Sequence, residues 1–282
     1  MSFARRISWL MTNRNTVLLY LPLLVLTAYA VGPMLILVFN SLKTTSEIFT
    51  NPFLPTVDPQ WSNYAEAFRA GRFGQKMLIS VMLVLLVVPC VLIISFPAAY
   101  VLARLRSVWS DVVVLFLLVV STVPPQLYLV PMFVFLSQNG LLNNLGVLGV
   151  IYLAKFSPFA VFILRAFLLR VPEELDDAAY LDGASTGRLM FTILAPICRP
   201  VLITVAVITA LNIWNEFVLA VTFIQDADLK PISTSLYAFR SQYSTDWPLT
   251  NAGAVISALL PVFVYMILQR RFIEGLTSGS VK

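Results

Sequence analysis

The sequence predicts an all-α protein that crosses a membrane six times. Of its 282 residues, 59% are hydrophobic and only 12% are charged, whereas a soluble domain carries about 25% charged residues. A membrane-spanning helix needs roughly 20 mostly apolar residues, and stretches of that length recur along the chain. Basic residues are also distributed unevenly between the segments that join these stretches. Together, these observations predict a polytopic membrane protein.

Six apolar stretches qualify as spans. They run from about residues 17–42, 78–102, 112–136, 145–169, 201–224 and 252–268. The first is too long for a cleavable signal peptide, and no small-residue cleavage site follows it. We therefore expect an N-terminal segment 1–16, a first helix with an external segment 17–77, a five-helix core 78–268, and a tail 269–282. The external segment 43–75 is either a docking surface or a cap.

Prolines interrupt two of the stretches. Pro124, Pro125 and Pro131 are expected to bend the third, because proline removes a helical hydrogen bond and clashes with the preceding turn. Ser157-Pro158 predicts a kink in the fourth. Bent helices suit a translocation route, although they also occur in other helix bundles.

Basic residues set the expected orientation, because cytoplasmic loops carry an excess of Lys and Arg. If both termini lie inside, twelve basic residues are cytoplasmic and six are external. The cytoplasmic set is Arg5, Arg6, Arg14, Arg104, Arg106, Arg165, Arg170, Arg188, Arg199, Arg270, Arg271 and Lys282; the external set is Lys43, Arg69, Arg72, Lys76, Lys230 and Arg240. This orientation places residues 171–200 in the cytoplasm.

The 171–200 loop is an unusual polar island between two apolar stretches. It contains five acidic residues, which are Glu173, Glu174, Asp176, Asp177 and Asp182. Pro172 suits the first position of a helix, and the acidic residues complement the positive end of the helix dipole. Gly183 favours a turn, and a second short helix is expected from about Ala184 to Thr192. The pattern predicts a helix, a glycine turn and a helix at the membrane surface.

This loop resembles the cytoplasmic coupling motif of bacterial ABC importer permeases. The motif has the form E-A-A, three residues, G, nine residues, I, one residue, L-P, and it is matched by Asp177-Ala178-Ala179, Gly183, Ile193 and Pro196. Asp177 replaces the usual Glu and keeps its charge, and Ala195 replaces the usual Leu and stays apolar. Residues 181–185 resemble the carbohydrate-importer version of the motif.

The resemblance covers most of the chain from about Asn63 onward. It extends through Pro97-Ala98-Ala99-Tyr100-Val101-Leu102-Ala103-Arg104, Val123-Pro124-Pro125-Gln126, Leu129-Val130-Pro131, Phe162-Ile163-Leu164-Arg165 and Trp214-Asn215-Glu216-Phe217. The tail from Gln269 to Lys282 is similar to the maltose-type tail, whereas Ile79 replaces an Asn that is frequent in the family. The resemblance implies a type I ABC importer permease fold in a bacterial inner membrane.

The resemblance also implies partners. These are a second homologous permease, two ABC ATPase subunits, an external solute-binding protein and a sugar substrate. ATP and Mg are then bound by the ATPase subunits, so that no cofactor is expected in this chain. The coupling surface is expected to comprise Glu174, Asp177, Ala178, Ala179, Asp182, Gly183 and Ala184. The alternative for the loop, a helix lying on lipid headgroups, is disfavoured by its acidic residues.

Polar residues within the apolar stretches are candidates for the substrate path. Lys155 lies near the middle of the fourth stretch, where a charge is costly and usually faces an interior or a cavity. It either lines the path or forms a structural ion pair or partner contact. Asn212, Asn215 and Glu216 share one helical face on the basis of their spacing; they either bind solute or clamp helices together, and we favour the clamp. Gln126 and Tyr128 are weaker path candidates.

Several other functions are excluded or disfavoured. The chain contains no histidine, and no G-x-x-x-x-G-K-[ST] loop occurs, so that an intramembrane serine protease and a self-contained ATP-driven pump are excluded. An enzyme and a nucleic-acid partner are not expected, and the two cysteines, Cys90 and Cys198, are interpreted as buried apolar groups. The alternatives are an ABC permease for a polyol or a glycerol phosphoester and, less favoured, an ion-coupled secondary transporter.

Overall fold

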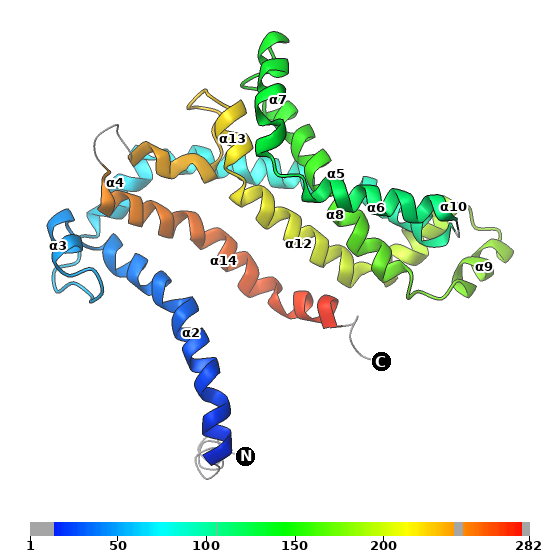
Figure 1. Ribbon diagram of the computed structural model, residues 1–282, viewed down its shortest axis with the longest axis horizontal. Helices are drawn as coiled ribbons and strands as arrows, with labels where there is room; N and C mark the ends of the chain where they lie inside the picture. The colour runs from blue at the N-terminus through cyan, green and yellow to red at the C-terminus, as the bar shows by residue number, and fades with distance from the viewer. Residues whose placement is uncertain (1–13, 106, 240–244, 278–282) are drawn as a thin grey trace. The chain divides into compact units, whose positions relative to one another are not determined.

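The computed structural model describes residues 14–105, 107–239 and 245–277. In chain order its helices are α2 Arg14–Ser41, α3 Thr45–Thr50, α4 Ser62–Ala70, α5 Phe73–Arg104, α6 Val108–Thr122, α7 Gln126–Gln138, α8 Leu145–Leu168, α9 Glu174–Leu181, α10 Thr186–Arg188, the π-helix η1 Leu189–Leu194, α11 Ala195–Ile197, α12 Arg199–Asn215, α13 Val218–Phe223, the 3₁₀-helix η2 Ile232–Phe239 and α14 Trp247–Thr277 (Figure 1). The expected cytoplasmic or external positions of Arg5, Arg6, Arg106, Arg240 and Lys282 lie outside the described residues.

The chain forms two compact units. The first comprises the residues up to Gly71 together with Leu236–Ile256, and the second comprises Arg72–Ser235 together with the residues from Ser257 onward. The expected boundary between 17–77 and 78–268 therefore falls a few residues after the start of the second unit. The early part of α14 belongs to the first unit and the later part to the second.

In the first unit, a polar network holds the segment after α2 in place. Lys43 is fully buried, and its Nζ donates to Asn40 Oδ1 at 3.0 Å and to the Asn51 carbonyl at 2.6 Å. Asn63 Nδ2 donates to the carbonyls of Ser41 and Lys43, both at 3.0 Å. These bonds tie α4 to the end of α2 and order the segment between them. That this segment is external, and that it serves as a docking surface or as a cap, stay predictions.

The core of the second unit lies between α5 and α8. Leu148, Tyr152, Leu164 and Leu168 of α8 are all at least 99% buried, and they belong to one apolar cluster with the buried face of α5, including Val91. α8 continues through Pro158 as one helix from Leu145 to Leu168. Figure 1 shows α9 and α10 at one end of this unit.

The third expected span is two helices rather than one. α6 and α7 are bent by 85° at a short break between Thr122 and Gln126. Val123 has an extended backbone (φ −66°, ψ 116°) because the residue before a proline is driven out of the helical region. Pro124 and Pro125 thus end one helix and start another, where only a bend was expected. Pro131 remains inside α7.

The fifth expected span, about residues 201–224, is also broken. α12 ends at Asn215, Glu216 has an extended backbone (ψ 112°), and α13 begins at Val218. A second bend of 82° separates Thr186–Ile197 from Arg199–Asn215. By length and composition, four described helices can each cross a membrane, and up to six crossings result if each bent pair counts as one. The prediction of an all-α protein with several membrane spans is confirmed. When each bent pair is counted as one crossing, however, the fifth crossing begins at Thr186, inside the 171–200 loop.

Candidate functional site

The 171–200 loop folds as the expected helix, glycine turn and helix. α9 ends in a Schellman motif, in which Gly183 N donates to Tyr180 O at 3.0 Å and Ala184 N donates to Ala179 O at 2.9 Å. Gly183 has φ +76°, a backbone conformation that other residues adopt only with strain. The second helical run starts at Thr186 and continues through η1 to Ile197, which is longer than expected.

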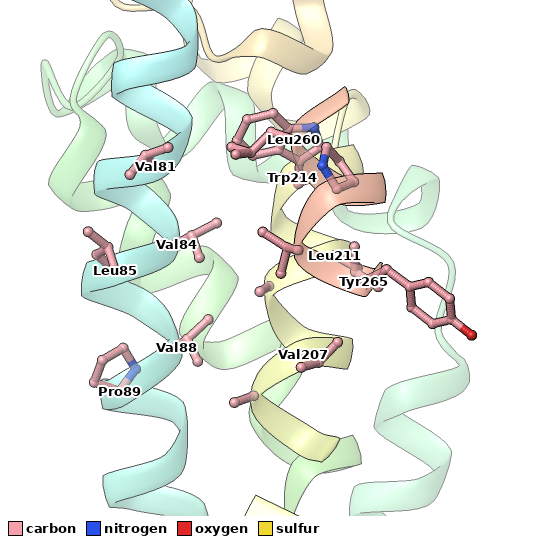
Figure 2. Close-up of a pocket in the computed structure, with 14 residues that line it drawn as sticks. Val81, Val84, Leu85, Val88, Pro89, Val207, Leu211, Trp214, Leu260 and Tyr265 are labelled. Atoms are coloured by element: carbon pink, nitrogen blue, oxygen red, sulfur yellow. The ribbon is translucent and has the colours of Figure 1, made fainter. Parts of the chain in front are cut away.

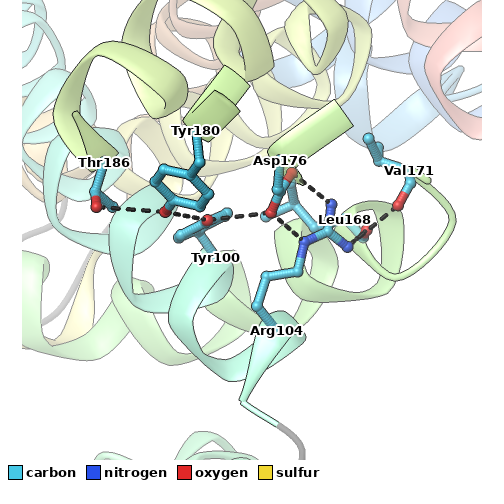
Figure 3. A network of polar contacts seen from close by, with 7 residues as sticks. All are labelled: Tyr100, Arg104, Leu168, Val171, Asp176, Tyr180 and Thr186. Carbon is cyan, nitrogen blue, oxygen red and sulfur yellow. Dashed lines mark hydrogen bonds and ion pairs between the residues drawn. The ribbon is translucent and has the colours of Figure 1, made fainter. Parts of the chain in front are cut away.

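A buried ion pair attaches α9 to the rest of the second unit (Figure 3). Asp176 Oδ2 accepts from Arg104 Nε at 2.8 Å, and Asp176 Oδ1 accepts from Arg104 Nη2 at 3.3 Å. The two side chains are only 9% and 14% exposed. Arg104 Nη1 also donates to the carbonyls of Leu168 at 3.2 Å and Val171 at 3.1 Å. One guanidinium therefore joins the end of α5, the end of α8 and the start of α9.

A chain of hydroxyl groups extends this contact to the second helical run. Tyr100 OH lies 3.1 Å from Asp176 Oδ2, Tyr180 OH lies 3.4 Å from Tyr100 OH, and Thr186 Oγ1 lies 3.4 Å from Tyr180 OH. A carboxylate only accepts, so that Tyr100 donates its single proton to Asp176. Tyr180 must then donate to Tyr100, and Thr186 must donate to Tyr180. The order of donors in Figure 3 therefore runs from Thr186 to Asp176.

The exposed face of the loop differs in part from the expected coupling surface. Glu174, Asp177, Ala178, Asp182 and Gly183 are exposed, Ala184 is half-buried, and Ala179 is only 4% exposed. The structure therefore does not present Ala179 to a partner, because its side chain belongs to the buried core cluster.

The sequence did not reveal the positions of two important residues of the loop. Leu181 is 89% exposed at the tip of α9, although leucine is normally buried. Asp176 is the buried anchor, although it was grouped with the other acidic residues. Asp176 and Ala179 are three residues apart and therefore share a face of the helix. Because alanine is small and apolar, this spacing could have indicated that Asp176 lies on the buried face of α9.

The intramembrane Lys155 forms an ion pair with Glu216. Lys155 Nζ lies 3.2 Å from Glu216 Oε1, and the two side chains are 26% and 5% exposed. Tyr152 OH donates to Glu216 Oε2 at 3.1 Å. The Glu216 carboxylate also accepts from the backbone N–H groups of Leu219 at 3.1 Å and Ala220 at 3.2 Å. Glu216 is thus surrounded by donors and fixes the break between α12 and α13 against α8.

The expected shared face of Asn212, Asn215 and Glu216 is wrong for Glu216, whereas Asn212 and Asn215 do lie three residues apart within α12. The helix ends at Asn215, so that Glu216 turns into the core while Asn212 and Asn215 stay exposed. Asn215 Nδ2 bonds to the Leu211 carbonyl of its own helix at 2.9 Å. Tyr128 is half-buried and lies close enough to Glu216 to interact with its charge.

The structure therefore brings Tyr128, Tyr152, Lys155 and Glu216 together within the second unit. No described contact joins Gln126, Asn212 or Asn215 to this group. Gln126 is exposed at the start of α7.

A pocket of about 430 Å³ lies between α5, α12 and the later part of α14 (Figure 2). Its walls are apolar and include Val84, Val88, Val207 and Leu211. The Tyr265 hydroxyl points away from the pocket in Figure 2. A pocket that offers few polar groups is a poor site for a polar solute, whose hydroxyl groups would lose their hydrogen bonds to water.

Comparison with known proteins identifies similar sequences and a similar fold. The family described as "Binding-protein-dependent transport system inner membrane component" matches residues 92–277. The probable ABC transporter permease protein YurM of Bacillus subtilis is 32% identical over 252 residues, which is 89% of this chain and 83% of that protein. The diacetylchitobiose uptake system permease protein NgcG of Streptomyces coelicolor is 30% identical over 92% of this chain and 87% of its own length.

A solved structure shares the fold. It is a bacterial ABC transporter involved in the import of the acidic polysaccharide alginate, and it matches with a TM-score of 0.75. The match covers 96% of this chain and 99% of that chain, at 20% sequence identity.

The glycine turn can be tested with two matched substitutions. Gly183→Ala is expected to destabilise the protein by about 1–2 kcal/mol, because alanine is strained at φ +76°. Gly187→Ala, in α10 with no atom within 4 Å of an added Cβ, is expected to stabilise by up to about 1 kcal/mol. Thermal unfolding in detergent measures both effects, and equal shifts for the two variants would contradict the assigned turn.

The ion pair can be tested in the same way with neighbouring aspartates. Asp176→Asn leaves the partly buried Arg104 without its counter-charge, which is expected to cost about 2–3 kcal/mol, less than for a fully buried pair. Asp177→Asn changes an exposed residue and is expected to stay within about 0.5 kcal/mol of wild type. The measurement is again the midpoint of thermal unfolding. A wild-type midpoint for Asp176→Asn would rule out the anchor.

Proposed function

The chain belongs to the family of binding-protein-dependent transport system inner membrane components, and from this we propose that it forms half of the path by which an ABC importer moves a carbohydrate. The family match covers more than half of the chain. The protein is thus an ABC transporter permease, a multi-pass membrane component of a transport system and not an enzyme. Permeases of this family act together with an ATPase, a solute-binding protein and another permease.

The proposed role of the 171–200 loop is to couple the ATPase to the membrane helices. The observation that carries this role is the attachment of α9 to α5 and α8 through the Arg104 and Asp176 side chains. Because the contact is buried and charged, a displacement of α9 is transmitted to both long helices. The exposed face, with Leu181, Asp177 and Asp182, remains available for an ATPase subunit.

The proposed cycle requires a difference in binding between two states. ATP shifts the transporter only if the closed ATPase pair, with the loop docked, is favoured in one state of the membrane helices over the other. We assign ATP and Mg to the partner ATPase subunits, with no cofactor in this chain. The proposed orientation places both termini and the loop in the cytoplasm.

A carbohydrate is the proposed solute class. The names of relatives support it, since NgcG belongs to a diacetylchitobiose uptake system and the similar structure belongs to an alginate importer. A polyol or a glycerol phosphoester is the alternative solute, and an ion-coupled secondary transporter is the alternative mechanism.

The proposed path residues separate into two groups. Lys155 keeps a partly exposed side chain, so that its ammonium can donate hydrogen bonds to solute oxygens while Glu216 orients it. Glu216 itself is the clamp between helices. Gln126, Asn212 and Asn215 remain path candidates because they expose amide groups within membrane helices.

The docking face is tested with Leu181→Ser and, as a control, Val57→Ser. Both wild-type side chains are apolar and exposed, at 89% and 102%, but Val57 lies far from the loop in sequence. Loss of a central apolar contact typically costs over 1 kcal/mol, so that Leu181→Ser is expected to weaken co-purification of the ATPase about 10-fold. Val57→Ser is expected to retain it. Equal retention by both variants would remove Leu181 from the docking face.

Solute class and coupling are tested by ATPase activity of the complex in lipid. We expect one pairing of binding protein and carbohydrate to stimulate the wild type, and Leu181→Ser to lose that stimulation. Polyols and glycerol phosphoesters serve as competing solutes. Uptake that follows an ion gradient without any ATPase would instead establish the secondary transporter.

A further inference from the structure

Three cationic side chains gather at the start of α5, at the opposite end of that helix from Arg104. Arg72 immediately precedes α5, Lys76 lies in its first turn, and Lys230 lies in the segment after α13. Lys76 is close enough to Arg72 and Lys230 to interact with both charges. α5 has 32 residues, so that about 48 Å separates this cluster from the coupling loop.

Hydrogen bonds hold this arrangement in place. Arg72 forms an ion pair with Asp228, and Gln75 Nε2 donates to the Asp228 carbonyl at 2.7 Å. One turn further along α5, Ser80 Oγ accepts from the Ile232 N–H at 2.8 Å. The segment that contains Lys230 is therefore bound to α5 on both sides of that lysine. The proximity of the cations is a built feature of the second unit.

The positive charges in the cluster outnumber their acidic partners. Asp228 pairs with Arg72, whereas neither Lys76 nor Lys230 forms an ion pair with any residue that the structure describes. Lys76 is nevertheless only 6% exposed. Among the described residues, the Lys76 ammonium is not one of the buried polar atoms that lack a partner, so the stem of the side chain is buried while its charged end reaches the surface. The positive end of the α5 dipole adds to the positive charge there.

Two other lysines show that this chain otherwise supplies partners for such groups. Lys43 is fully buried and donates to Asn40 and to the Asn51 carbonyl. Lys155 pairs with Glu216. Lys76 differs from both. A lysine that extends from a helix end into lipid headgroups leaves its stem on the outer surface, whereas the stem of Lys76 is covered by protein.

We propose that Lys76, Lys230 and Arg72 bind the anionic group of the transported solute, a carboxylate, sulfonate or phosphate on a carbohydrate. Lysine and arginine are the residues that bind oxyanions most strongly, through charge-assisted hydrogen bonds. The anion would contact an ammonium that has no acidic partner among the described residues. This inference rests on the proposed function, which places this end of α5 on the side where the solute arrives. It narrows the solute class to acidic carbohydrates.

The direct test is the thermal stability of the purified complex with matched acidic and neutral probes. Digalacturonate is expected to raise the unfolding temperature of the wild type, whereas galactobiose at equal ionic strength is not. Lys76→Gln and Lys230→Gln are expected to lose the shift, and Lys76→Arg is expected to retain it. Arg69→Gln, which removes an exposed charge from α4, is the control and is expected to keep it. No shift in the wild type, or an equal shift in Lys76→Gln, overturns the proposal.

One further measurement distinguishes an anion on the solute from an anion on the binding protein. Another distinguishes failure of the anion site from failure of the proposed carbohydrate import. If Lys76→Gln weakens binding of the solute-free binding protein, the anionic group belongs to that protein and the solute assignment is wrong. If Lys76→Gln instead raises the KM for acidic solutes at least 10-fold in the ATPase assay, and the KM for neutral solutes is unchanged, the assignment holds. If no carbohydrate stimulates the ATPase but the digalacturonate shift persists, the anion site stands and the proposed carbohydrate import falls.

Discussion

The ion pair between Arg104 and Asp176 is the contact on which the arrangement of the second unit depends. It connects residues that are 72 positions apart in the chain, and the same guanidinium binds the carbonyl groups at the end of α8. The Leu168 carbonyl already accepts from the Val171 N–H at 3.1 Å, and Arg104 adds a second donor to it and also donates to the Val171 carbonyl. The proposed coupling depends on this attachment, because it links α9 to two long helices by side-chain contacts as well as by the chain itself.

Glu216 performs a similar task within the membrane. Its carboxylate accepts from two backbone N–H groups, a tyrosine hydroxyl and the Lys155 ammonium, and these groups permit the chain to leave one helix and start another. Broken helices are tolerated at membrane depth only where their freed polar groups find partners. The break at Glu216 therefore places a carboxylate and an ammonium between helices in the second unit. Such groups are what a permease needs along a polar path, and the apolar pocket between α5, α12 and α14 does not provide them.

Local rules in the sequence were sufficient for part of this structure. Pro124 and Pro125 identify the break in the third span, and Gly183 identifies the turn after α9, because these residues restrict or permit backbone angles by themselves. The break at Glu216 carries no proline or glycine, so that helical periodicity wrongly placed Glu216 beside Asn212. Its cause is tertiary, since donors from α8 and α13 surround the carboxylate. Asp176 could not be told apart from its acidic neighbours for the same reason, because its partner Arg104 is distant in sequence. The family resemblance identified the loop but could not show that Ala179 faces inward and Leu181 outward.

We propose that the exposed face of α9 is the docking surface for an ATPase subunit. The most direct measurement is site-specific photo-crosslinking in the assembled complex, with the photoreactive residue placed at position 181 or at position 179. Position 181 is 89% exposed and position 179 is 4% exposed in the free chain. We expect an adduct with the ATPase from position 181 and only intramolecular products from position 179. Lipid adducts alone from position 181, with the ATPase bound, would contradict it.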